Sequence, residues 1–271
     1  MNMISIDLED YYCDLPFDRW KNYESRVVST TNVILQLFKK YKISATFFTV
    51  GYVAKKHPAL IEKIVSHGHE IASHTFSHPD LRKINKEDFI RDFNLSLNIL
   101  TKLSGEQILG FRAPFFSINK TNFWIFDILK KHLKYDSSIF PVKTTLYGIP
   151  DAPFHTYQMS ENNPLSNDND AEFIEIPPAT LSLPIIGRFP IAGGFHLRFL
   201  PFSLIKLGIN KLNKKNFQAM CYLHPKDIDP GFPKIPEYKW YYYWGLKQGL
   251  QKFESLLKNF KFCSVRENFS F

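Results

Sequence analysis

The chain has 271 residues, a formal net charge of +8 and a hydrophobic fraction of 44%. This length fits one large domain or two small ones, and this apolar content is typical of a globular protein with a sizeable core. No block of Lys and Arg is interleaved with stacking aromatic residues, so we predict no nucleic-acid partner.

The first half of the chain alternates between short apolar strands and amphipathic helices. A strand at 3–7 runs directly into three carboxylates, Asp7, Glu9 and Asp10. The further elements that we expect, in order, are a helix at 26–41, a strand at 45–50, a helix at 58–67, a strand at 69–72, a helix at 86–103 with Asn85 as its cap, a strand ending at Arg112, and a helix at 120–132.

The second half is interrupted by a stretch rich in Pro, Gly, Asn and Asp at 141–170, which we expect to be a long loop. The elements expected after it are strands at 172–177 and 189–194, a helix at 201–213, a strand at 217–223 that ends in His224, a long aromatic-led helix at 236–258, and a last strand at 261–265. Such alternation predicts a parallel α/β architecture, and the strand count favours one barrel spanning residues 1–271.

His74 and His78 are four residues apart. On one helical turn this spacing would put both imidazoles on the same face, where they could bind a divalent metal together with a nearby carboxylate. Zinc is the expected ion for such a mixed nitrogen and oxygen site. Taken alone, the motif is more often a pair of ordinary surface or core histidines.

Polar residues follow several of the predicted strands. The carboxylates at 7–10, the histidine pair, Arg112 and His224 each come where a strand ends. Parallel α/β folds build their sites at the carboxyl ends of strands, so we expect these groups to meet in one pocket.

The chain resembles the polysaccharide deacetylases of carbohydrate esterase family 4, which share a nodulation-protein-B-like homology domain. Within that family it is most similar to the branch associated with exopolysaccharide biosynthesis. The matching blocks lie in family order over nearly the whole chain, at 5–10, 46–48, 68–74 with His78, 111–114, 135–138, 189–194 and 223–225. The resemblance implies a distorted (β/α) barrel with about seven parallel strands.

The resemblance also implies roles for individual residues. It makes Asp7 the catalytic base, Arg112 the residue that orients and charge-pairs with that base, and His224 the general acid. His74 and His78 match the metal-binding histidines. Many relatives have two adjacent aspartates where this chain has Asp7-Leu8-Glu9-Asp10.

That departure leaves the third metal ligand open. Strand alternation puts Asp7 and Glu9 on one side, which favours Glu9 as the ligand, with Asp10 as the alternative if the strand turns early. Pro114, Asp136 and Ser137 lie in further matching blocks and are candidate substrate contacts. For Asp136 and Ser137, turn capping is an equally good interpretation.

Together these features predict a metal-dependent hydrolase that removes the N-acetyl group from an N-acetylated glycan or its lipid-linked precursor. The alternatives are hydrolysis of a non-sugar amide or cyclic imide, and a non-catalytic carbohydrate-binding protein on the same fold. The sequence has no charged leader, and its three cysteines share no metal-like spacing, so we expect a cytoplasmic protein. Its basic charge and the aromatic run at 238–244 leave open a peripheral contact with an anionic membrane at the inner face.

Overall fold

The structure is a computed structural model that describes residues 1–184 and 187–271. Among these residues, nine strands form one curled sheet and two form a separate hairpin. The strands are β1 (Asn2–Leu8), β2 (Thr46–Thr49), β3 (Glu70–Ser73), β4 (Gly110–Phe111), β5 (Tyr135–Asp136), β6 (Tyr157–Gln158), β7 (Ile174–Glu175), β8 (Thr180–Leu183), β9 (Gly187–Pro190), β10 (Met220–Leu223) and β11 (Phe262–Cys263).

The curled sheet is a distorted (β/α) barrel. Seven parallel strands follow one another in the order β10-β1-β2-β3-β4-β5-β7 among the described residues, while β11 pairs beside β1 and β6 is antiparallel to β7. Pro178, just beyond β7, forms an isolated parallel bridge with Met220 of β10, so the two ends of the sheet come together. The fold class that the sequence predicts is therefore confirmed.

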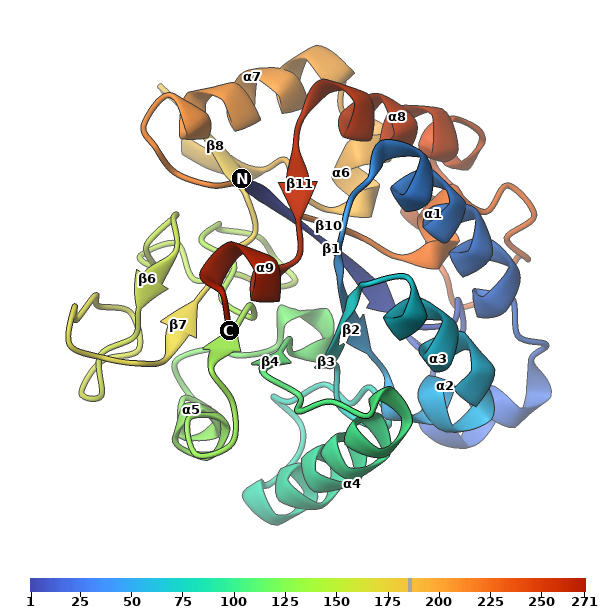
Figure 1. Ribbon diagram of the computed structural model, residues 1–271, viewed down its shortest axis with the longest axis horizontal. Coiled ribbons are helices and arrows are strands. Elements are labelled where there is room, and N and C mark those ends of the chain that lie inside the picture. The colour runs from blue at the N-terminus through green and yellow to red at the C-terminus, as the bar shows by residue number, and fades with distance from the viewer. Residues whose placement is uncertain (185–186) are drawn as a thin grey trace.

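Helices surround this sheet, as Figure 1 shows. They are α1 (Val27–Tyr41), α2 (Gly51–Lys56), α3 (Pro58–Ser66), α4 (Lys86–Ser104), α5 (Trp124–Leu129), α6 (Gly194–Phe199), α7 (Phe202–Asn213), α8 (Leu246–Asn259) and α9 (Val265–Phe269). No helix in the described part of the chain has the length and apolarity needed to cross a membrane.

Local sequence explains the main elements. All seven residues of β1 are buried, as expected for a central strand with neighbours on both sides. Asn85 caps α4, because its side chain accepts a hydrogen bond from the backbone N–H of Asp88, and Gly105 ends that helix with a φ of 70°. The Asn85 cap was expected from the sequence.

Several expected boundaries are wrong. The aromatic run does not start the last long helix, because α8 begins only at Leu246 and the run forms a short 3-10 turn at Trp240–Tyr242. The expected helix at 120–132 shortens to α5. The strand expected at 189–194 is present only at its start, because β9 ends at Pro190 and α6 begins at Gly194. Strand β8 and helix α9, which follows the last strand, were not expected from the sequence. The loop at 141–170 is mostly irregular but contains β6.

Candidate active site

A pocket of about 450 Å³ opens where the parallel strands end. Five of the residues singled out from the sequence line it, namely Asp7, Glu9, His74, His78 and His224. They come from three separate strand ends, those of β1, β3 and β10. The predicted convergence of these groups is therefore present in the structure.

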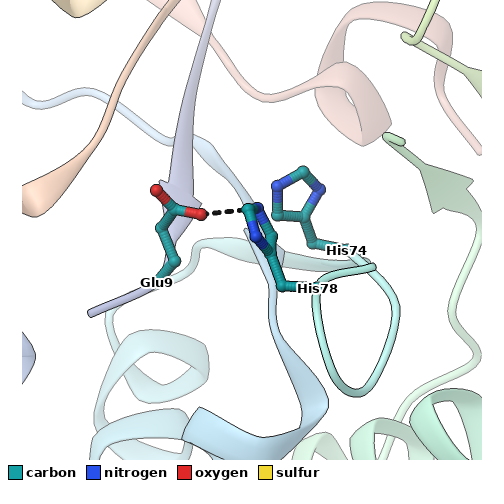
Figure 2. A group of neighbouring side chains, drawn as sticks. All are labelled: Glu9, His74 and His78. Atoms are coloured by element: carbon teal, nitrogen blue, oxygen red, sulfur yellow. Dashed lines mark ion pairs between the residues drawn. The ribbon is translucent and has the colours of Figure 1, made fainter. Parts of the chain in front are cut away.

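Glu9, His74 and His78 form the centre of the pocket (Figure 2). One potential ligand atom from each residue lies within 4.8 Å of the others, and all three residues are buried. Glu9 Oε2 is 2.7 Å from Nε2 of His78, and it accepts no aligned hydrogen bond from any described residue. A buried carboxylate oxygen without a hydrogen-bond donor destabilises the fold unless another group, such as a bound cation, satisfies it.

Both imidazoles are oriented by a hydrogen bond from Nδ1 to a backbone carbonyl oxygen. Nδ1 of His74 lies 2.7 Å from the carbonyl oxygen of Arg112, and Nδ1 of His78 lies 3.0 Å from that of Cys13. Each Nδ1–H therefore donates to a carbonyl. Nε2 of His74 is left facing the pocket, and Nε2 of His78 faces Oε2 of Glu9. This arrangement is common for metal-binding histidines.

The pKa values of the two histidines shift in opposite directions. Burial lowers the pKa of His74 to about 4, which keeps its imidazole neutral. Burial also acts to lower the pKa of His78, but the adjacent Glu9 carboxylate raises it overall. The donor set of two imidazoles and one carboxylate suits a divalent ion such as zinc.

The histidines do not lie on a helical turn, and that part of our expectation is wrong. They belong to an irregular loop after β3 in which Thr75 and His78 have φ values of 63° and 53°. The hydroxyl of Thr75 accepts a hydrogen bond from the His78 N–H, and Asp92 of α4 accepts from Phe76 N and Ser77 N. Left-handed backbone at non-glycine residues is strained, and such strain is concentrated at functional sites.

Asp7 and Arg112 form a buried ion pair beside this group. Arg112 Nη1 lies 2.6 Å from Asp7 Oδ1, and the two side chains are 0% and 3% exposed. The guanidinium also donates to Ser5 Oγ, Ser137 Oγ and the Ser137 carbonyl. Arg112 thus fixes one oxygen of Asp7 and leaves the other, Oδ2, 3.7 Å from Nε2 of His224.

Replacing Arg112 with methionine should destabilise the protein by about 3–5 kcal/mol, because it leaves the Asp7 carboxylate buried without its partner. Urea unfolding measures this change. The double variant Arg112→Met/Asp7→Asn should recover part of the loss, since it removes the orphaned charge as well. Equal destabilisation of the single and double variants would show that the ion pair does not cause the effect.

His224 is held in place by Asp227, which is itself paired with Arg198. Its Nδ1 lies 2.9 Å from Asp227 Oδ2, and Arg198 Nε lies 3.0 Å from Asp227 Oδ1. A Cβ on Gly194 would lie 1.7 Å from Asp227 Oδ2, so only glycine allows the carboxylate this position. Burial lowers the pKa of His224, but Glu9 and Asp227 raise it by more.

Lys226 forms an ion pair with the other carboxylate oxygen of Glu9, Oε1. Its Nζ lies 2.7 Å from Glu9 Oε1 and 2.7 Å from Asp14 Oδ2. Burial acts to raise the pKa of Glu9, but Lys226 and then His78 lower it well below its usual range. Glu9 is therefore ionised, with Oε1 occupied by Lys226 and Oε2 available.

Five of the sequence-predicted site residues do not line the pocket, and of these only Arg112 acts on it directly, through its ion pair with Asp7. Asp10, the alternative metal ligand, turns away and accepts hydrogen bonds from the N–H groups of Tyr11, Arg26 and Val27 near the start of α1. Pro114, Asp136 and Ser137 do not line the pocket and are buried. Asp136 accepts from the Ser138 N–H and hydroxyl, which are the hydrogen bonds of a turn cap.

Other residues were missed. Asp227 and Lys226 follow His224 within three residues, and the histidine–acid spacing was the signal that could have revealed Asp227. His196 lines the pocket, and its Nδ1 has no hydrogen-bond partner among the described residues. Arg198 and Asp14 carried no sequence signal.

Two family models match segments of this chain. Residues 13–132 match the family model "Polysaccharide deacetylase", and residues 137–270 match a domain of unknown function, DUF3473. Strands of the one curled sheet come from both matched segments, as do the residues around the pocket.

Two curated relatives have named activities. Over 114 residues, 42% of the chain, it is 32% identical to a peptidoglycan-N-acetylmuramic acid deacetylase of Bacillus subtilis, matching 23% of that protein. Over 85 residues, 31% of the chain, it is 35% identical to a peptidoglycan-N-acetylglucosamine deacetylase of Bacillus cereus, again matching 31% of that protein. The chain thus spans less than a third of the length of these relatives.

A solved structure shares the fold over nearly the whole chain. A Mycobacterium smegmatis protein assigned to the polysaccharide deacetylases superimposes with a TM-score of 0.64, covering 99% of this chain and 87% of that one. Sequence identity is only 16%, so this likeness speaks for the fold alone.

Proposed function

We propose that this chain, whose residues 13–132 match the polysaccharide deacetylase family model, is a hydrolase that removes N-acetyl groups from an N-acetylated glycan and releases acetate and a free amine. The observation that carries the proposal is the placement of Glu9, His74 and His78 next to Asp7 and His224 in one pocket. The substrate is a glycan, and a lipid-linked precursor at the inner face of a membrane is one form it can take.

Glu9, His74 and His78 are the residues that would hold a divalent metal. When bound there, the ion polarises the amide carbonyl and lowers the pKa of water. Oε2 of Glu9 and the Nε2 atoms of the two histidines fit this role, because one ligand atom from each residue lies within 4.8 Å of the others, and zinc is our expectation.

Asp7 and His224 carry the proton transfers. Asp7 Oδ2 accepts a proton from the water that attacks the acetamide carbon, while Arg112 holds the other oxygen in place. His224 then gives its Nε2 proton to the amide nitrogen as the C–N bond breaks, because an amine leaves far more easily than an amide anion. Asp227 holds Nδ1 of His224 so that Nε2 points to the reacting atoms.

The proposal is tested by acetate release. The purified full chain, loaded with zinc, is incubated with N-acetylglucosamine oligomers, peptidoglycan fragments and lipid-linked N-acetylhexosamines. Acetate and new primary amines should appear in equal amounts from at least one of them, and chelation should stop the reaction. Turnover of cyclic imides alone would favour the amidohydrolase alternative, and glycan binding without any acetate would favour a binding protein.

The pH dependence of deacetylation gives a further prediction. His224 must be protonated to act as an acid, so kcat should fall as the pH rises through its raised pKa. Asp227→Asn removes a carboxylate that raises this pKa and leaves the Arg198 charge uncompensated. The falling limb of the kcat profile should therefore move to lower pH.

Asp229→Asn is the matched control for this variant. Asp229 is two residues further along and pairs with Arg26, so its loss should leave the profile in place. If the falling limb of the kcat–pH profile stayed at the same pH in Asp227→Asn, His224 would not be the general acid.

A further inference from the structure

One face of the molecule combines exposed aromatic rings with lysines. Trp240 is 63% exposed, Trp244 52% and Phe199 47%. The ring centroid of Trp244 lies 5.8 Å from that of Trp240 and 6.1 Å from that of Phe199, so the three rings form one patch. We call this patch, together with the exposed Lys239 and Lys247 that flank it in the sequence, the aromatic–basic face. An apolar surface left open in this way usually marks a binding site.

The parts of the chain that build this face are basic and contain no acid. The stretches 176–226 and 238–253 have no Asp and no Glu. Their Lys and Arg residues outnumber the formal net charge of +8, so the remainder of the chain carries no excess of positive charge. The exposed lysines in the two stretches are Lys206, Lys211, Lys214, Lys215, Lys239 and Lys247. This uneven distribution of charge favours a partner surface that is anionic.

The three acids that lie between the two stretches are already paired. Their partners are Arg198 for Asp227, Arg26 for Asp229 and Arg19 for Glu237. Each of these carboxylates is matched by its own guanidinium, so none of them cancels the charge of the lysines on the face.

The aromatic rings of this face stand on a fixed backbone. Nη1 of Arg198 donates to the carbonyl oxygens of Tyr242 and Trp244. Nζ of Lys252, on α8, donates to the carbonyl oxygens of Arg198 and Leu200 at the end of α6, each at 2.8 Å. Because these contacts already hold the segments in place, little conformational entropy is lost when the face binds a partner.

Tryptophan and lysine side chains together suit the surface of a lipid bilayer. The tryptophan ring is amphipathic and is enriched at the level of the lipid headgroups. Lysines close to an anionic leaflet are attracted by its negative surface potential. One such signal alone gives weak, reversible membrane binding, and two signals on one surface give stable binding. The aromatic–basic face carries both.

We propose that the aromatic–basic face docks the protein on an anionic lipid bilayer, with its rings at the level of the headgroups and Lys239 and Lys247 against the lipid phosphates. This inference goes beyond the proposed function and does not depend on it. Trp240 also lines the pocket, so docking places the pocket entrance next to the bilayer. A glycan that is attached to a lipid would reach the pocket in that position.

Vesicle sedimentation tests the proposal. The purified full chain should bind mixed vesicles of phosphatidylcholine and phosphatidylglycerol but not vesicles of phosphatidylcholine alone, and added salt should weaken the binding. Trp244→Ser should lower the partition coefficient roughly tenfold, because the ring no longer leaves water. Lys239→Gln/Lys247→Gln should lower it by about fivefold for each lysine.

Matched controls come from α2 and α4, which lie at the opposite side of the molecule from α8 in Figure 1. Leu95→Ser replaces an apolar residue of α4 that is 44% exposed. Lys55→Gln/Lys102→Gln removes two exposed lysines and changes the net charge by the same amount as the test variant. Both controls should leave the partition coefficient nearly unchanged.

Fluorescence locates the contact. Brominated lipids in the mixed vesicles should quench the tryptophan emission, and Trp240→Phe/Trp244→Phe should remove most of this quenching, since Trp20 is buried. Absence of vesicle binding, binding that ignores lipid charge, equal losses in the test and control variants, or quenching that survives the double replacement would overturn the proposal. So would Trp244-dependent binding of soluble N-acetylglucosamine oligomers without any binding of vesicles. None of these measurements uses acetate release, so the docking face and the deacetylase activity succeed or fail separately.

Discussion

Alanine in place of His78 should abolish both metal binding and acetate release. The imidazole supplies one of three ligand atoms that lie within 4.8 Å of one another, and nothing else in the described residues can replace its Nε2. Loss of a mere hydrogen-bond partner to a metal ligand costs about 10–100-fold in affinity, so loss of a ligand should cost more. Metal content by elemental analysis and acetate release on the same samples measure the two effects.

Two histidine variants serve as controls for this experiment. His224→Ala should keep the metal but lose activity, because His224 lies in the pocket outside the ligand group. His67→Ala, at an exposed position, should keep both. Full metal content in His78→Ala would show that the metal, if bound, is held elsewhere.

Asparagine in place of Asp7 should lower kcat by about 10²–10⁴-fold, the usual contribution of a general base. The side chain keeps its shape and its place beside Arg112 but can no longer take a proton from water. Metal content should stay the same, because Asp7 is not part of the Glu9, His74 and His78 group. Steady-state kinetics with the best substrate, together with metal analysis, check both statements.

The control for Asp7→Asn is the same change three residues further on. Asp10→Asn should leave kcat and metal content nearly unchanged and lower only the stability, since Asp10 accepts hydrogen bonds at the start of α1. Loss of metal in Asp10→Asn with metal kept in Glu9→Gln would restore Asp10 as the third ligand.

The order of elements and the barrel could be predicted because hydrophobic period and strand–helix alternation are local signals. β1, α1 and α4 occur within a residue or two of their expected places. The aromatic run at 238–244 was misjudged, since stacked rings there resemble the apolar face of a helix. Their exposure depends on where Arg198 anchors the backbone, which no local pattern shows.

The sequence by itself determined that polar groups would collect at the strand ends, because parallel strands share one direction and their carboxyl ends share one edge. It did not decide which of those groups face the pocket. The Glu9 N–H donates to the Asp7 carbonyl in a tight turn after β1, and this turn directs Glu9 inwards while Asp10 caps a helix. Likewise Ser137 accepts a hydrogen bond from Arg112 and does not face the pocket. The fold also brings Asp227 next to His224 and Lys226 next to Glu9. Side-chain direction at a strand end depends on the turn that follows and on long-range partners, and these exist only once the barrel has formed.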